Sequence, residues 1–119
     1  MNRQLEGLQP DAIARATDTL GWTPSKIEVA DTFAARLGGL IIRPPIEGAG
    51  ELRVLVFPKC HAVHTCFMRY PLDIAFVDAR GDVLVLYQGV APWRFLSHPS
   101  AAAVLERASV MANFPLCFA

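Results

Sequence analysis

Residues 72–87 have the sequence LDIAFVDARGDVLVLY, and this stretch decides the fold class. Within 72–77, large apolar side chains fall on every second residue, which is the period of a β-strand. The segment 78–82 predicts a hairpin connection, with Gly81 at a position that requires positive φ. The return strand, 83–87, is almost wholly apolar, so we expect it to be buried on both faces.

Further short strands are expected on both sides of this hairpin. Residues 26–29 alternate polar and apolar side chains, which predicts a half-buried strand. Residues 52–57 predict another strand, which leads through Pro58 into a candidate strand at 62–68. Near the C-terminus, 101–111 favours a helix by local propensity, because alanine, leucine and glutamate dominate it.

The expected helices are few and short. Residues 11–20 have weak helical spacing and end at Gly21. A second short helix is expected at 33–37, with Gly38 and Gly39 as stop signals. Short strands joined by Gly/Pro turns, with one or two short helices, predict a mainly β fold, either a small β-sandwich or a barrel-like domain.

The length of 119 residues suits one domain and leaves no room for two. We expect residues 1–24 to form an N-terminal arm with a possible short helix, and 25–119 to form a single β-rich domain. Trp22 is expected to dock the arm onto that domain.

Composition argues against several classes of protein. Apolar residues make up 53% of the chain and the mean hydropathy is +0.33, yet charges interrupt every stretch before it reaches the length of a membrane span. Arg3 and Glu6 fall where a signal peptide would be apolar, and three cysteines suggest no closed disulfide framework, so we expect a cytoplasmic protein. Lys+Arg and Asp+Glu are both 11, which indicates neither a nucleic-acid nor a membrane partner. For the oligomeric state, a monomer and a homodimer are both compatible with the sequence.

An ordered series of motifs runs through most of the chain. Its densest part is His64-Thr65 followed by Met68-Arg69-Tyr70-Pro71-Leu72-Asp73-Ile74, with Phe76-Val77-Asp78, Pro92-Trp93 and Val104-Leu105-Glu106 after it. The series resembles the domain-of-unknown-function family numbered 192, a group of uncharacterised bacterial and archaeal β-rich domains.

This resemblance implies a β-sandwich-like fold and assigns no activity. It also implies that 102–107 is a strand despite its helical propensity, and we follow the resemblance there because tertiary pairing overrides propensity. The C-terminal residues 113–119 depart from the family pattern, which leaves open how the sheet edge is closed.

The segment 60–69 holds the densest group of side chains that could carry chemistry. On an extended strand, Cys60, His64, Cys66 and Met68 would share one face. Thiolate and imidazole are ligands that suit zinc or cuprous copper, so Cys60, His64 and Cys66 form one candidate metal site. The alternative, which we favour, is a strand whose cysteines pack as small apolar groups, with no cofactor.

Nucleophilic catalysis is a second hypothesis for the same segment. Cys66 would be the nucleophile, His64 its base and Asp73 the group that orients the imidazole. Side chains two residues apart on a straight strand are about 6–7 Å apart, too far for a hydrogen bond, so we place this enzyme behind a non-catalytic role.

A third hypothesis is a polar site that binds a small ligand or a segment of a protein partner. Its candidate residues are His64, Thr65, Arg69 and Asp73, with Arg43 from the preceding loop. An arginine held by an aspartate beside a histidine is suited to a carboxylate or phosphate. The alternative is that Arg69 and Asp73 form a structural ion pair across the bend between them.

Two other groups of residues have simpler interpretations. Asp78, Arg80 and Asp82 are expected to be a solvated hairpin tip. Trp93 and Phe95 would either close the end of the core, which we favour, or present an aromatic patch to a partner.

The sequence alone therefore predicts a β-domain that binds an unknown small ligand or protein partner through the His64–Asp73 face, with a metal-dependent or cysteine-based enzyme as the alternative.

Overall fold

Strands are the main regular structure of the described chain. The computed structural model describes residues 8–23, 25–29, 52–66, 68 and 70–109. Its elements are α1 (Ala12–Leu20), β1 (Ser25–Val29), β2 (Leu52–Pro58), β3 (Ala62–His64), β4 (Leu72–Val77), β5 (Val83–Val90), β6 (Phe95–Ser97) and β7 (Ala103–Ala108). The mainly β prediction is confirmed.

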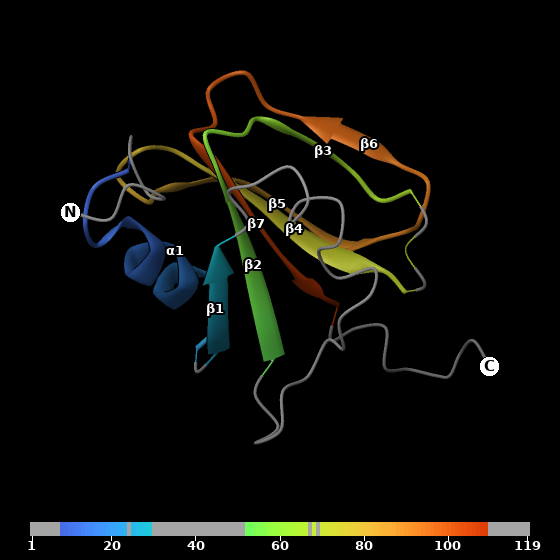
Figure 1. The fold of residues 1–119 in the computed structure, drawn as a ribbon, viewed down its shortest axis with the longest axis horizontal. Coiled ribbons are helices and arrows are strands. Elements are labelled where there is room, and N and C mark those ends of the chain that lie inside the picture. Colours follow the sequence, from blue (N-terminus) through green and yellow to red (C-terminus); the bar gives the residue numbers. More distant parts are fainter. Residues whose placement is uncertain (1–7, 24, 30–51, 67, 69, 110–119) are drawn as a thin grey trace.

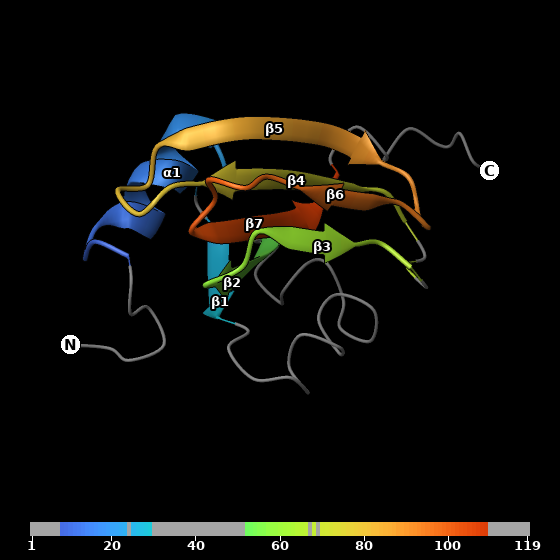
Figure 2. The same ribbon diagram turned by 90° about the horizontal axis from the view of Figure 1, so that it is seen from above.

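The described strands form two sheets of unequal size (Figure 1). The larger has five strands in the order β1-β2-β7-β4-β5, and β3 pairs with β6 in a two-stranded ribbon. Within the larger sheet only β1 and β2 are parallel, and the other pairs are antiparallel. Figure 2 shows β5 and β1 at opposite edges of this sheet. The sheet is open, so the arrangement is sandwich-like.

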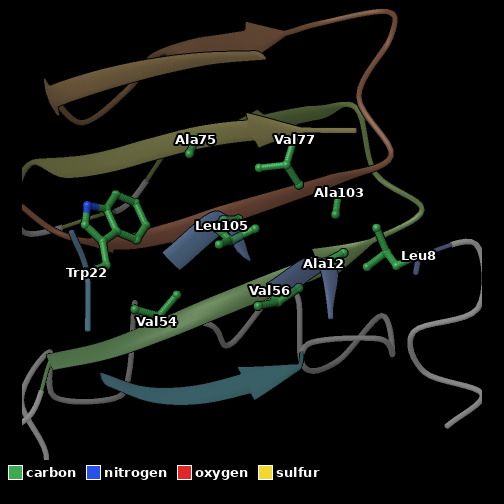
Figure 3. Close-up of a cluster of buried hydrophobic side chains, with 10 residues drawn as sticks. Leu8, Ala12, Trp22, Val54, Val56, Ala75, Val77, Ala103 and Leu105 are labelled. Atoms are coloured by element: carbon green, nitrogen blue, oxygen red, sulfur yellow. The ribbon is translucent and has the colours of Figure 1, made fainter. Parts of the chain in front are cut away.

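One face of the large sheet packs against α1, and we call it the helix face. Alternate residues of β2, β4 and β7 point toward this side, where they meet apolar side chains from the helix and from Trp22 (Figure 3). The buried members of this cluster are Leu8, Ala12, Ala16, Trp22, Val54, Val56, Ala75, Val77, Ala103 and Leu105. The prediction that Trp22 docks the N-terminal segment is confirmed, since only 3% of it is exposed.

The opposite face packs against the β3–β6 ribbon, and we call it the ribbon face. Its cluster takes the other alternate residues of the same strands, together with Met68, and Val63 and Leu96 of the ribbon pack against it. The buried sheet residues of this cluster are Leu55, Phe57, Leu72, Ile74, Phe76 and Val104. The described residues therefore form three layers: helix, sheet and ribbon.

The hairpin between β4 and β5 turns as the sequence predicts. Gly81 has φ of +94°, and a Cβ there would lie 2.2 Å from the Ala12 carbonyl oxygen, so the tip approaches the start of α1 too closely for any side chain. Arg15 of the helix also pairs with Asp82 at 2.7 Å. At the other end of α1, Gly21 adopts φ of 73° and its N–H donates to the Asp18 carbonyl, which ends the helix.

Two expectations about strands are wrong. The strand expected at 62–68 ends at His64, because the Met68 N–H turns back to the Thr65 carbonyl at 3.2 Å. β5 is half-buried and not enclosed on both faces, since it lies at an edge of the sheet. By contrast, β7 confirms the strand that the family resemblance implied at 102–107. The helix expected at 33–37 lies outside the described residues.

Among the described residues, no helix combines the length and the apolar character needed to span a membrane.

Candidate functional site

Thr65 holds the turn after β3 against the loop before β6. Its hydroxyl donates to the Ala91 carbonyl at 2.7 Å and accepts from the Arg94 N–H at 2.9 Å. Its own N–H donates to the Arg94 carbonyl at 2.9 Å, and its carbonyl accepts from the Trp93 N–H at 3.1 Å. Only 1% of Thr65 is exposed. The Thr65 hydroxyl thus uses both its donor and an acceptor position to hold the 91–95 loop in place.

Trp93, at the centre of that loop, has an unusual conformation. Its φ is +68°, a region that bulky residues rarely adopt because the Cβ approaches the carbonyl oxygen. The side chain is nevertheless 60% exposed, so core packing does not account for the conformation. Strain of this kind persists only where the surrounding structure imposes it, and here the Thr65 hydrogen bonds do so.

The β3–β6 ribbon presents a second large aromatic side chain to solvent. Val63 and Leu96 are opposite each other and face the core, so the adjacent cross-strand pair, His64 and Phe95, faces outward. Phe95 is 70% exposed and His64 is also exposed. We call His64, Trp93 and Phe95 the aromatic patch. The expectation that Trp93 and Phe95 close the core is wrong, because Val63 and Leu96 fill that role.

The three candidate metal ligands do not converge. Cys60 packs partly against the ribbon-face core and its thiol donates to the Ala62 carbonyl at 3.1 Å. His64 faces outward, and its Nδ1 accepts the Cys66 backbone N–H at 3.2 Å. Met68 is buried in the core, so the shared face expected for this segment does not form. In the part of the chain that the structure describes, no three His, Cys, Asp or Glu side chains form a metal-binding group.

Asp73 lies on the opposite side of the sheet from the ribbon. It is fully buried, and its two carboxylate oxygens accept from the Arg107 Nε at 3.2 Å and from the Gly89 N–H at 3.0 Å. The Arg107 guanidinium in turn lies 4.5 Å from the centre of the Trp22 ring, a cation–π contact. Asp73 therefore ties β4 to β7 and β5, far from the outward-facing His64.

Of the five residues predicted to bind a ligand, only His64 is exposed among those described. Thr65 and Asp73 are buried and hold backbone or side-chain partners inside the protein. Arg43 and Arg69 lie outside the described residues. The structure thus moves the candidate surface from the His64–Asp73 segment to His64 together with the 93–95 loop.

The tip of the β4–β5 hairpin carries a network of charges. Arg80 pairs with Asp78 at 3.5 Å and with Asp82 at 3.2 Å. Desolvation is the largest single influence and acts to raise the pKa of Asp78. Hydrogen bonds from the Asp82 and Arg80 backbone N–H groups, together with the charge of Arg80, outweigh it and hold that pKa below its ordinary value. The network is an exposed hairpin clamp, in line with the solvated tip that the sequence suggests.

Sequence reasoning missed Glu106 as a chemically unusual residue. Its carboxyl lies on the ribbon face between Leu55 and Ile74, and only 6% of the residue is exposed. Burial raises the pKa of Glu106 from 4.5 to about 8, so the carboxyl holds its proton at neutral pH. The sequence does contain a signal for its burial. Glu106 directly follows the apolar residues 103–105 and stands two residues after Val104, so on a strand it shares the face of Val104.

Comparisons with known proteins place the chain within one family. Residues 14–113 match the family model DUF192, which is described as "Uncharacterized ACR". A UPF0127 protein from Thermococcus sibiricus is 32% identical over 78 residues, which cover 62% of this chain and 47% of the relative. The chain thus spans about half the length of that curated relative.

Two solved structures share the fold. A protein of unknown function from Novosphingobium aromaticivorans superimposes with a TM-score of 0.58 and 26% identity, covering 75% of this chain and 66% of the other. A putative transcription regulator from Sinorhizobium meliloti also gives a TM-score of 0.58, at 18% identity, covering 73% of this chain and 70% of the other. At that identity the second likeness is one of fold alone.

Proposed function

We propose a partner-binding role without catalysis for this chain, which belongs to the DUF192 family. The binding surface is the aromatic patch of His64, Trp93 and Phe95, and the partner is another protein. The observation that carries the proposal is the conformation of Trp93, which is strained, 60% exposed and fixed in place.

A fixed exposed tryptophan is well suited to protein recognition. Fixing the backbone of the loop that carries a large side chain lowers the entropy that association costs, and tryptophan is among the residues that contribute most to interfaces. Phe95 adds a second anchor two residues further along the chain, on the outer side of a short ribbon whose inner side is packed. The exposed Arg94 between them supplies a polar contact for the rim of an interface.

The chemistry of the same region favours binding over catalysis. The Nδ1 atom of His64 accepts a hydrogen bond from the Cys66 backbone N–H. The imidazole therefore contacts the backbone of Cys66 through this nitrogen, and not its thiol. Net charge is zero, so a protein surface is a better match than a polyanion. A cytoplasmic location and a monomeric or dimeric state belong to this proposal as expectations.

The test compares three immobilised proteins in extract of the source organism: wild type, Trp93→Ala/Phe95→Ser, and Arg80→Ala as a matched surface control. We expect one protein to be retained by wild type and by the control, and to be lost from the double variant. Its purified form should then bind wild type in solution with defined stoichiometry, as measured by calorimetry.

Retention of the same proteins by all three baits would overturn the proposal. So would a candidate partner whose purified form binds the double variant as tightly as wild type. Circular dichroism spectra of the three baits establish that each is folded before the comparison is made.

A further inference from the structure

The ribbon face contains a second group of polar side chains, separate from the aromatic patch. The pairing of strands places Glu28 of β1, Leu55 of β2, Glu106 of β7 and Ile74 of β4 in one row across the sheet. Directly paired residues point to the same face, so both carboxyls lie on the ribbon face with one strand between them. With neighbouring strands about 4.8 Å apart, their backbones are about 10 Å apart.

Arg53 completes this group. It precedes Leu55 by two residues on β2 and so shares its face, and its guanidinium forms an ion pair with Glu28. Both side chains are largely buried. The positive charge of Arg53 is thereby balanced within the site, which leaves Glu106 as the carboxyl of this group that has no ion-pair partner among the described residues.

The state of Glu106 itself points to a ligand. Within the described part of the chain, no hydrogen bond or ion pair reaches its carboxyl, although the residue is 94% buried, the complement of its 6% exposure. Buried carboxyls without partners are costly and uncommon. Every fully enclosed side-chain oxygen in the described residues has a partner, so the Glu106 oxygens keep some contact with solvent and can be reached.

We propose that Glu106, flanked by the Glu28–Arg53 ion pair, is the anchor of a binding site for a small aliphatic amine. The ammonium group donates to the Glu106 carboxylate, and the alkyl chain extends from it toward solvent, because Leu55 and Ile74 beside Glu106 are already buried. A slim ligand is required because little of the carboxyl is exposed. This inference is independent of the aromatic patch and of any protein partner.

An amine fits this site better than an anion or a metal ion. Arg53 is held by Glu28, so an incoming anion would have to displace that carboxylate. In the described ranges no third carboxyl, imidazole or thiol joins the group, which leaves too few ligands for a metal. An ammonium group supplies both the charge and the donors that an ionised Glu106 lacks.

Binding must be accompanied by the loss of one proton. At neutral pH the free carboxyl is protonated, because burial raises its pKa to about 8. When the alkylammonium ion binds, the Glu106 O–H bond breaks, its proton passes to solvent, and the carboxylate pairs with the ammonium. The apparent affinity should therefore rise about tenfold per pH unit between pH 6 and pH 7, and level off above about pH 8.

The experiment is a titration of the full chain with n-butylamine, followed by NMR of the methyl groups of Leu55 and Ile74. Butan-1-ol is the neutral ligand control. The variants are Glu106→Gln, which keeps the shape of the protonated acid, and Asp18→Asn, which removes an exposed carboxylate from α1.

We expect saturable shifts with n-butylamine in wild type and in Asp18→Asn, little response to butan-1-ol, and affinity at least about tenfold weaker in Glu106→Gln. Equal responses in wild type and Glu106→Gln would overturn the inference. An affinity that does not change between pH 6 and pH 7 would also overturn it, and this measurement needs only the wild-type protein.

Discussion

Trp93 combines a strained backbone, which lowers the stability of the folded state, with an exposed ring, which adds little to that stability. A left-handed backbone costs a residue with a side chain roughly 1–2 kcal/mol, and the exposed ring gains little from burial. Evolution for stability alone would place glycine or asparagine at such a position. The presence of tryptophan at a fixed, exposed point is why we assign it to binding.

The backbone strain at Trp93 can be measured by comparing two variants that both lack the ring. We expect Trp93→Gly to be more stable than Trp93→Ala by about 1 kcal/mol, because only glycine adopts φ near +68° without strain. Urea unfolding gives both values. The matched control is Ser97→Gly against Ser97→Ala on the exposed strand β6, where the order should reverse. Equal stabilities of the two Trp93 variants would contradict the assignment of strain.

Glu106 predicts a dependence of stability on pH. The folded state raises the pKa of this carboxyl from 4.5 to about 8, so between these values the folded protein binds more protons than the unfolded chain. The contribution of Glu106 to the free energy of unfolding is therefore fully present below about pH 4.5 and is lost as the pH rises toward 8. Arg53 and Glu28 face it from β2 and β1 but neutralise each other, and Ile74 on β4 carries no charge.

The variant Glu106→Gln isolates this effect, since an amide does not titrate. The free energy of unfolding of wild type minus that of Glu106→Gln should fall between pH 5 and pH 8, by at most about 1.4 kcal/mol per pH unit. Denaturant unfolding at four pH values provides the measurement, with Asp18→Asn as the surface control. A difference that is constant over this range would show that the carboxyl titrates normally.

At the scale of elements, Asp73 connects three strands. It lies on β4, accepts from Arg107 on β7, and binds the backbone of Gly89 in β5. The register between β4 and β5 shifts between Leu72 and Ile74, and Gly89 with φ of 65° lies in the corresponding part of β5. The carboxylate thus stabilises the irregularity through which β5 leads to the Trp93 loop.

Replacing Asp73 with asparagine should destabilise the protein by about 3–5 kcal/mol, because Arg107 would keep its buried charge without a counter-ion. The double variant Asp73→Asn/Arg107→Met should recover part of this loss. Chemical denaturation of the single and double variants tests both statements. If the single variant loses less than about 1 kcal/mol, the pair is not a structural link.

The sequence was informative where structure depends on neighbouring residues. The alternation in 72–77 and the turn at Gly81 are local, and the structure has both. The Asp73–Arg107 pair spans 34 residues and exists only because β4 lies next to β7, which no spacing along the chain indicates. For the same reason the half-buried state of β5 and the outward direction of Phe95 were not predicted, since both depend on the order of strands and on which ribbon face meets the core.

At the scale of the whole molecule, the layers depend on one another. The large sheet has an apolar cluster on each face, and neither would be shielded from water by the sheet alone. The helix face takes Leu8, Ala12, Ala16 and Trp22 from the N-terminal segment. We therefore propose that residues 1–24 are part of the folding unit of the β-rich domain and not an arm that is merely attached to it.

Removal of residues 1–24 tests this dependence. The shortened chain would expose the helix face, including Val54, Val56 and Leu105, which are fully buried in the intact protein. Full burial of each such side chain contributes roughly 1.5–3 kcal/mol, and a domain of this size has only about 5–15 kcal/mol in total, so we expect cooperative unfolding to be lost. Thermal melts by circular dichroism and binding of a hydrophobic dye give the readout.

The full-length variant Trp22→Ala is the graded control. It should keep a cooperative transition at a lower temperature, because only one side chain of the helix layer is removed. A shortened chain with a sharp transition close to that of wild type would mean that the sheet and the ribbon form a stable domain without the helix.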